Sequence, residues 1–335
     1  MLSLLGRGYA LAMRMREMGY TGGVFPSWRP PVMCISVGNI GWGGSGKTPL
    51  CSWILSWSVQ KNLHPVVLTR GYRARPPHLP YHVQRKSTVE AAGDEPLMLA
   101  RENPLAEVVV DPCRRRGGQW AWDMFRPDLF ILDDGLQHLA VQRDVDLVLI
   151  RPHDLHRDWN RVIPAGPWRE GPRALLRASS LIINSEPEDA GAMEDLLNHK
   201  LPGWAKPIFH CAYRVTGLRR VIDDSPGQPT GDFLLVSGVG NPDGVEASAQ
   251  GTLGRSPVDH LRYPDHYAFH ISDWQKITQR AASEGAKFIV CTLKDSVKLE
   301  GLADERLYAL DLELSWHDPK GRESSFSTWL QEQVS

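Results

Sequence analysis

The chain has 335 residues, long enough for two ordinary domains that each bury a core. Its 38 Lys and Arg residues almost balance its 39 Asp and Glu residues, so no net charge draws the whole chain towards nucleic acid. The five cysteines are widely spaced and form no C-x-x-C pair, which argues against a disulfide framework and a zinc site. This cysteine usage favours a reducing, cytosolic compartment.

The N-terminal segment, residues 1–18, mixes apolar and basic side chains. They are Leu2, Leu4, Leu5, Tyr9, Leu11, Ala12, Met13 and Met15, interleaved with Arg7, Arg14 and Arg16. The segment lacks the roughly 18 consecutive apolar residues that a membrane-spanning helix needs and the cleavage site of a secretory signal. The pattern fits a basic amphipathic helix on a membrane surface, and it fits equally an ordinary surface helix packed on a domain.

The segment 41–48 matches G-x-x-x-x-G-K-S/T, the phosphate-binding P-loop. An apolar, β-branched run at 31–37 predicts a strand before it, and helical spacing in 50–60 predicts a helix after it. In such a loop, backbone N–H groups and a helix N-terminus bind phosphate oxygens. Lys47 would add a positive charge, and the Thr48 hydroxyl a ligand for phosphate-bound Mg²⁺. The predicted phosphate-binding residues are Gly41, Gly43, Gly44, Ser45, Gly46, Lys47 and Thr48.

Short apolar strands alternate with helical stretches along the first part of the chain. Strands are predicted at 65–69, 107–110, 128–132, 145–150 and 181–184, and a helix begins near 93–96. This alternation predicts an α/β fold with a parallel sheet covered by helices on both faces. Ligands of such sheets bind beyond the carboxyl ends of the strands, so we expect the loops after several strands to share one crevice.

The composition changes near residue 206. Residues 208–215 predict an isolated strand, and the proline-rich segment 223–229 predicts a turn or linker. New apolar strands are predicted at 233–237 and 287–292. The predicted parts are a P-loop domain over 1–205, a linker over 206–230 and a smaller α/β domain over 231–335.

Two acidic residues, Asp133 and Asp134, directly follow the predicted strand 128–132. In P-loop proteins a carboxylate at this place holds Mg²⁺ directly or through water. Two aspartates after a strand are otherwise an ordinary turn, but the upstream P-loop favours the metal role.

Three further residues are candidates for catalysis. The Asp94 carboxylate can accept the proton of an attacking hydroxyl, although Gly-Asp-Glu-Pro at 93–96 favours Asp94 as a helix N-cap. His266 lies between Pro264-Asp265 and Tyr267, a setting typical of a structural histidine unless domain closure brings it to the crevice. Arg169 is the arginine that we select as a cation for developing phosphoryl charge.

Together these stretches resemble the tetraacyldisaccharide 4′-kinases, P-loop enzymes of lipid A biosynthesis. Asp-Asp-Gly-Leu-Gln-His at 133–138 is more specific than the P-loop alone, and the matches keep their order through most of the chain. They cover 37–40, 43–49, 69–72, 93–96, 132–138, 143–144, 164–167, 169–170, 238–242, 264–266 and 294–299. One departure is Leu293, where family members usually carry an acidic residue.

The resemblance implies two α/β/α domains of the P-loop NTPase type, with largely parallel sheets, joined by a short two-stranded linker. It implies ATP- and Mg²⁺-dependent transfer of the γ-phosphate to the 4′-hydroxyl of tetraacyldisaccharide 1-phosphate, which gives lipid IVA. By similarity, Asp94 would be the general base and His266 its partner across the domain gap. Lys47 and Thr48 would hold the phosphates and Mg²⁺, and the metal would also be served by Asp133, Asp134 and Glu170.

The family acts at the cytoplasmic face of the bacterial inner membrane. For this chain the resemblance therefore favours a peripheral protein that docks through the segment 1–18 and binds a glycolipid substrate. It implies neither a nucleic acid nor a protein partner.

Two other functions fit parts of the sequence. A P-loop switch that controls a protein partner would use the same loop and Asp133, but no guanine-reading Asn-Lys-x-Asp sequence follows the strands. A kinase for a soluble sugar would need no membrane-facing helix.

Overall fold

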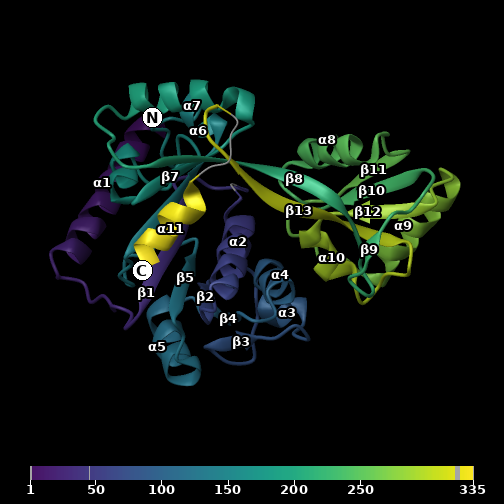
Figure 1. Ribbon diagram of the computed structural model, residues 1–335, viewed down its shortest axis with the longest axis horizontal. Helices are drawn as coiled ribbons and strands as arrows, with labels where there is room; N and C mark the ends of the chain where they lie inside the picture. The colour runs from purple at the N-terminus through teal and green to yellow at the C-terminus, as the bar shows by residue number, and fades with distance from the viewer. Residues whose placement is uncertain (1, 45, 321–324, 335) are drawn as a thin grey trace.

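The computed structural model describes residues 2–44, 46–320 and 325–334. They form two lobes connected by a pair of long strands (Figure 1). One hydrogen-bonded sheet runs through both lobes in the order β11-β10-β12-β13-β8-β7-β6-β1-β5-β2-β4-β3. The predicted α/β class is confirmed.

The N-terminal lobe contains the P-loop and a mostly parallel sheet. Its strands are β1 (Met33–Asn39), β2 (Pro65–Thr69), β3 (Tyr81–Val83), β4 (Glu107–Val110), β5 (Leu129–Asp133), β6 (Val145–Ile150) and β7 (Ser180–Asn184). The central strands are almost continuously apolar because helices cover both faces of the sheet. Among the strands described in this lobe, β3, at the edge, is the one that runs antiparallel to its neighbour.

The helices of this lobe divide between the two faces of the sheet. They are α1 (Leu2–Thr21), α2 (Lys47–Gln60), α3 (Val89–Ala92), α4 (Asp94–Glu102), α5 (Arg114–Phe125), α6 (Pro152–His156) and α7 (Pro187–Lys200), with a 3₁₀ helix at Pro172–Arg177. Ile35 and Val37 of β1 pack with Ile54 of α2 in one core cluster. Cys34, which points to the opposite face, packs with Ala121 of α5.

The C-terminal lobe is a smaller sheet with its own core. Its elements are β10 (Phe233–Ser237), α8 (Pro242–Leu253), β11 (Asp259–Arg262), α9 (Ile271–Ser283), β12 (Phe288–Cys291) and α10 (Leu293–Leu299). Leu234 and Val236 of β10 pack with Ile277 of α9 on one face, and Leu235 packs with Ala249 of α8 on the other.

Two long antiparallel strands, β8 (Ile208–Arg220) and β13 (Leu307–His317), connect the lobes. β8 pairs in parallel with β7, and β13 pairs in parallel with β12. A short strand, β9 (Pro226–Gly227), adds to β8. The predicted linker at 206–230 therefore contains β8, whereas its partner strand comes from residues far along the chain.

The last helix, α11 (Phe326–Val334), returns to the N-terminal lobe. The buried Phe326 ring stacks on Trp316 with centroids 3.9 Å apart, and Trp57 Nε1 of α2 donates to Ser327 Oγ at 3.2 Å. Sequence reasoning assigned all of 231–335 to the second domain, but the structure packs this helix beside the P-loop helix because its apolar face matches the aromatic face of α2.

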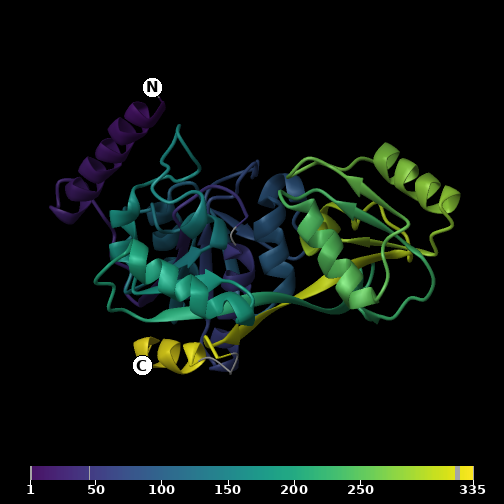
Figure 2. The ribbon, with the colours of Figure 1, turned by 90° about the horizontal axis from the view of Figure 1, so that it is seen from above.

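The first helix, α1, lies along the outer edge of the N-terminal lobe, far from α11 (Figure 2). The buried Gly6 and the partly buried Ala10 face the lobe. Arg16 Nη1 donates to the Gln137 carbonyl at 2.9 Å, and Glu17 pairs with Arg177 at 3.2 Å. Among the residues described here, no helix is both long and apolar enough to cross a membrane.

We predict that Phe326→Ala destabilises the protein by about 3–5 kcal/mol, because it removes a fully buried ring from the α2–α11 contact. Urea unfolding followed by tryptophan fluorescence measures the loss. The matched control is Thr328→Ala at an exposed position of the same helix. Equal stability of the two variants would contradict the packing role of α11.

Candidate functional site

The P-loop connects the end of β1 to the start of α2. Gly46, the N-cap residue of α2, has a φ of 85°, and Gly43 has a φ of 99°, so both need the left-handed backbone that glycine adopts easily. Lys47 Nζ donates to Asn39 Oδ1 at 3.0 Å, and Thr48 lies in the first turn of α2. Of the predicted phosphate-binding residues, Ser45 lies outside the described part of the chain.

Two aspartates lie beside this loop at the end of the neighbouring strand β5: Asp133 is its last residue, and Asp134 follows it. Asp133 is buried and accepts from Thr69 Oγ1 at 2.9 Å. Burial, together with the charges of Glu95 and Asp134, raises the pKa of Asp133 to about 6. Asp134 lies 3.5 Å from Lys47 Nζ. Asp133 and Asp134 therefore lie together beside the P-loop, and the charge of Glu95 acts on Asp133.

Arg169 neutralises part of this negative charge. Its two terminal nitrogens donate to the two oxygens of Asp134 at 2.7 and 2.8 Å, and Nη2 also donates to Asn39 Oδ1 at 2.6 Å. Burial alone would raise the pKa of Asp134, but the Arg169 hydrogen bonds and the Lys47 charge hold it well below its usual range. The structure thus groups Lys47, Asp133, Asp134 and Arg169.

Glu170 is not part of this group in the structure. Both of its carboxylate oxygens accept from Arg177, at 3.0 and 2.8 Å, and its side chain is buried. Arg177, which holds Glu170, lies in the 3₁₀ helix Pro172–Arg177, whereas Arg169 is held by Asp134 beside the P-loop. The metal role predicted for Glu170 stays a prediction that this arrangement does not test.

Asp94 begins α4 and faces the other lobe. The N-cap of α4 is Gly93, so the cap that local sequence favoured for Asp94 is wrong. The carboxylate is buried, with Oδ1 accepting from the Glu95 amide at 3.0 Å. Burial alone would raise the pKa of Asp94, but the hydrogen bond from His266 and the charge of Lys294 lower it.

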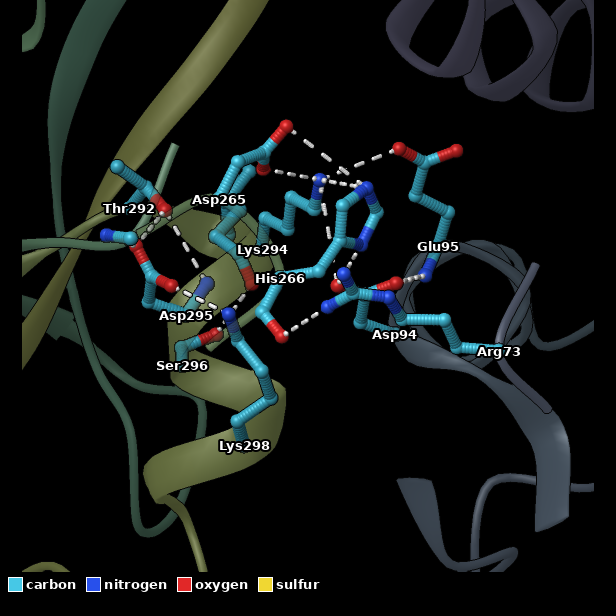
Figure 3. Close-up of polar contacts among 12 residues, drawn as sticks. Arg73, Asp94, Glu95, Asp265, His266, Thr292, Lys294, Asp295, Ser296 and Lys298 are labelled. Atoms are coloured by element: carbon cyan, nitrogen blue, oxygen red, sulfur yellow. Dashed lines mark hydrogen bonds and ion pairs between the residues drawn. The ribbon is translucent and has the colours of Figure 1, made fainter. Parts of the chain in front are cut away.

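His266 meets Asp94 across the gap between the lobes, although 172 residues separate them in the chain (Figure 3). Its Nδ1 lies 2.9 Å from Asp94 Oδ2. His266 has a φ of 59°, unusual for a residue with a side chain, and its carbonyl accepts from Arg73 Nη1 at 3.1 Å. The ring also makes an edge contact with Tyr72, at 5.1 Å between centroids.

Glu95 links the Asp94 side of the site to the P-loop side. The charge of Glu95 raises the pKa of Asp133, which lies beside the P-loop. Its Oε1 also lies 3.4 Å from Nζ of Lys294, which belongs to the other lobe. Glu95 therefore acts on both groups of residues, those of the interlobe contact and the acidic residues beside the P-loop.

Comparisons with known proteins identify the family of the chain. The family model LpxK, described as tetraacyldisaccharide-1-P 4′-kinase, matches residues 1–334. Among curated relatives, the tetraacyldisaccharide 4′-kinase of Nitratidesulfovibrio vulgaris is 44% identical over 97% of this chain and 91% of its own length. That of Oleidesulfovibrio alaskensis is also 44% identical, over 99% of this chain and 94% of its own length.

The chain belongs to the tetraacyldisaccharide 4′-kinase family. The resemblance seen in the sequence is thereby confirmed, and with it the class of enzyme, a phosphotransferase. A crystal structure titled the "apo" form of LpxK from Aquifex aeolicus in complex with ATP matches with a TM-score of 0.77 at 26% identity. The match covers 99% of this chain and 98% of that one.

Three residues near the kinase site were not predicted from the sequence. Lys294 contacts His266 from the first turn of α10, and Glu95 contacts Lys294 from α4. Tyr213, on the linker strand β8, donates its hydroxyl to the Gly46 carbonyl at 2.9 Å. Family motifs included the first two without assigning them a role, whereas nothing local marks Tyr213.

We predict that Tyr213→Phe loosens the P-loop without unfolding the protein. Loss of one hydrogen bond worth about 1 kcal/mol should speed amide hydrogen exchange in residues 46–50 roughly five-fold. The control is Tyr308→Phe, because the Tyr308 ring packs on Phe288 in the other lobe. Unchanged exchange at 46–50 would show that the hydroxyl does not support the loop.

Proposed function

We propose that this protein transfers the γ-phosphate of ATP to the 4′-hydroxyl of tetraacyldisaccharide 1-phosphate, with Asp94 as general base. The observation that carries the proposal is the 2.9 Å contact between Asp94 and His266, which holds a buried carboxylate at the boundary between the lobes. Family membership supports the substrate, because the curated relatives carry that substrate in their names.

The nucleotide would bind with its phosphates at the P-loop. The backbone of this loop and the first turn of α2 offer N–H donors, and Lys47 adds a positive charge. Lys47 and Arg169 both contact Asp134, so the two cations lie close together beside the loop. They would balance the negative charge that develops on the transferred phosphoryl group.

The residues beside the loop suit Mg²⁺. Asp133 and Asp134 offer carboxylate oxygens and Thr48 offers a hydroxyl, all hard donors. The raised pKa of Asp133 fits a cation partner, because burial and neighbouring carboxylates make its own charge unfavourable. When bound, Mg²⁺ would neutralise charge on the phosphate oxygens.

Asp94 would take the proton of the 4′-hydroxyl as the sugar oxygen bonds to the γ-phosphorus. The bond between that phosphorus and the bridging oxygen breaks, and ADP leaves with the bond's electrons. Because its pKa is lowered, Asp94 is ionised at neutral pH and can accept a proton. The transfer is favourable late in the reaction, since the sugar oxygen grows more acidic as it bonds to phosphorus.

The outer face of α1 would hold the enzyme on the cytoplasmic face of the inner membrane. Large apolar side chains stand exposed along it, each more than a third accessible: Leu2, Leu5, Tyr9, Leu11, Met15 and Met18. The buried Gly6 and the partly buried Ala10 face the lobe instead. Arg7 and Arg14 would add attraction to anionic headgroups.

We expect Asp94→Asn to lower kcat by about 10²- to 10⁴-fold, because an amide cannot accept the proton. Its affinity for ATP should stay near that of the wild type. Labelled ATP with the lipid disaccharide, a soluble glucosamine and no acceptor measures both activity and acceptor choice. Glu90→Gln, at an exposed position of α3, is the control.

Near-normal turnover of Asp94→Asn would remove Asp94 as the base. Equal phosphorylation of the soluble sugar would favour the soluble-sugar kinase instead. Rapid ATP consumption without any acceptor would favour a P-loop switch that controls a protein partner.

We further expect Leu5→Glu to weaken sedimentation with vesicles of anionic lipid several-fold, since it places a charge in the apolar face of α1. Leu105→Glu is the matched control, because Leu105 is also exposed but lies in the loop after α4. If both variants sediment like the wild type, α1 does not dock on the membrane.

A further inference from the structure

Lys294 makes a contact with His266 that the mechanism above does not use. It lies in the first turn of α10, whose start is fixed by the Thr292 side chain accepting from the Asp295 amide. Its Nζ lies 3.0 Å from His266 Nε2, the ring nitrogen that does not contact Asp94, and 4.0 Å from Asp94 Oδ2 (Figure 3).

We propose that Lys294 is a positioning residue that fixes the proton of His266 on Nδ1, so that the ring donates a hydrogen bond to Asp94. The proposal deepens the proposed function and rests on the role of Asp94 given there. Lys294 itself touches neither the transferred phosphoryl group nor the hydroxyl in this mechanism.

The direction of the contact follows from what each group can do. A lysine ammonium has three donors and no acceptor. A hydrogen bond between Lys294 Nζ and His266 Nε2 therefore runs from lysine to histidine, and Nε2 must carry a lone pair. A neutral imidazole with a lone pair on Nε2 carries its proton on Nδ1. That proton points at Asp94 Oδ2, 2.9 Å away.

Charge favours the same state of the ring. A second proton, on Nε2 as well as on Nδ1, would set two cations 3.0 Å apart, which costs free energy in a site largely removed from water. A proton on Nε2 alone would leave the ring neutral but would set two donors against each other. Lys294 stays charged: burial works against the ammonium, but the carboxylates of Glu95, Asp94 and Asp265 hold its pKa above the usual value. The neutral ring with Nδ1–H is the state that fits both neighbours.

The ammonium is held in place by acceptors from both lobes. Asp265 Oδ1 lies 3.0 Å from Nζ, and Glu95 Oε1 lies 3.4 Å away. With His266 Nε2 these give three acceptors for three donors, so the side chain has one preferred orientation. Its side chain is only 16% exposed. The groups that face it are thus Glu95 and Asp94 from α4, and Asp265 and His266 from the loop before α9.

Without the ammonium the ring would be free to place its proton on Nε2. Nδ1 would then present a lone pair to the Asp94 carboxylate, and the two acceptors would repel each other. Asp94 would lose the bond that orients it and one source of its lowered pKa. An interlobe ion pair alone would not have this effect, which makes the two roles separable by experiment.

The test compares Lys294→Met, which keeps the length of the side chain but has no donor, with Lys294→Arg. The control is Glu300→Gln, which removes the ion pair of Arg101 in α4 with Glu300, the residue directly after α10, and does not change His266. Full-length protein labelled with ¹⁵N-histidine is measured by two-bond ¹H–¹⁵N correlation at pH 8, and His266→Asn identifies the signal. Thermal unfolding checks that each variant is folded.

We expect His266 of the wild type and of Glu300→Gln to show a protonated Nδ1 and a bare Nε2. In Lys294→Met the ring should show the other tautomer or a mixture. The kcat of Lys294→Met should fall by about 10²-fold, while its KM for ATP changes less than about two-fold. A misplaced base slows the chemical step and leaves nucleotide binding unchanged. Lys294→Arg should restore part of the activity and the wild-type tautomer.

A wild-type ring protonated on Nε2, or a Lys294→Met ring that keeps its proton on Nδ1, would overturn the proposal. The spectra are recorded without turnover, so they report the tautomer whether or not Asp94 is the base. Failure of the base assignment would appear instead as normal activity of Asp94→Asn with the expected tautomer.

Discussion

The antiparallel pairing of β8 with β13 is the constraint on which the rest of the structure depends. The ladder runs from Tyr308 opposite Arg220 to His317 opposite His210, and each strand continues the sheet of one lobe. The backbone hydrogen bonds of this ladder fix how the second lobe faces the first. The contact of Asp94 with His266 is possible because this connection brings α4 and the loop before α9 together.

Charge within the site is balanced by two separate groups of residues. Beside the P-loop, Lys47 and Arg169 offset Asp134. At the lobe boundary, Lys294 donates to the Asp265 carboxylate, and Arg73 donates to the carbonyl of His266. Buried charges are costly unless they are paired, so each half of the site is assembled with its own counterions.

Much of the fold could be predicted from local sequence. The buried strands β1, β2, β5, β6 and β10 are short apolar runs, and the P-loop motif lies between β1 and α2. The alternation of apolar and polar residues in β13 is typical of a half-buried strand, but the strand was missed, and its pairing with β8 about 100 positions earlier leaves no local signal. The position of α11 was missed for the same reason, since its partner α2 lies far away in the chain.

The site, like the fold, could be predicted from local sequence only in part. Lys47, Asp133 and Asp134 follow strand ends, and strand ends of a parallel sheet share one edge. Local sequence alone favoured a cap for Asp94 and a structural role for His266, and their pairing came from family resemblance. A contact between two lobes leaves no periodic trace in either segment, so neither Lys294 nor Tyr213 could be assigned a role from the sequence.

The bond between Tyr213 and Gly46 joins the interlobe strand β8 directly to the phosphate loop. An added Cβ at Gly46 would overlap the Tyr213 hydroxyl, and Gly46 also has a φ of 85°. Any larger residue at this position would therefore strain the turn and displace the strand that connects the two lobes, so two separate constraints select glycine at this one place.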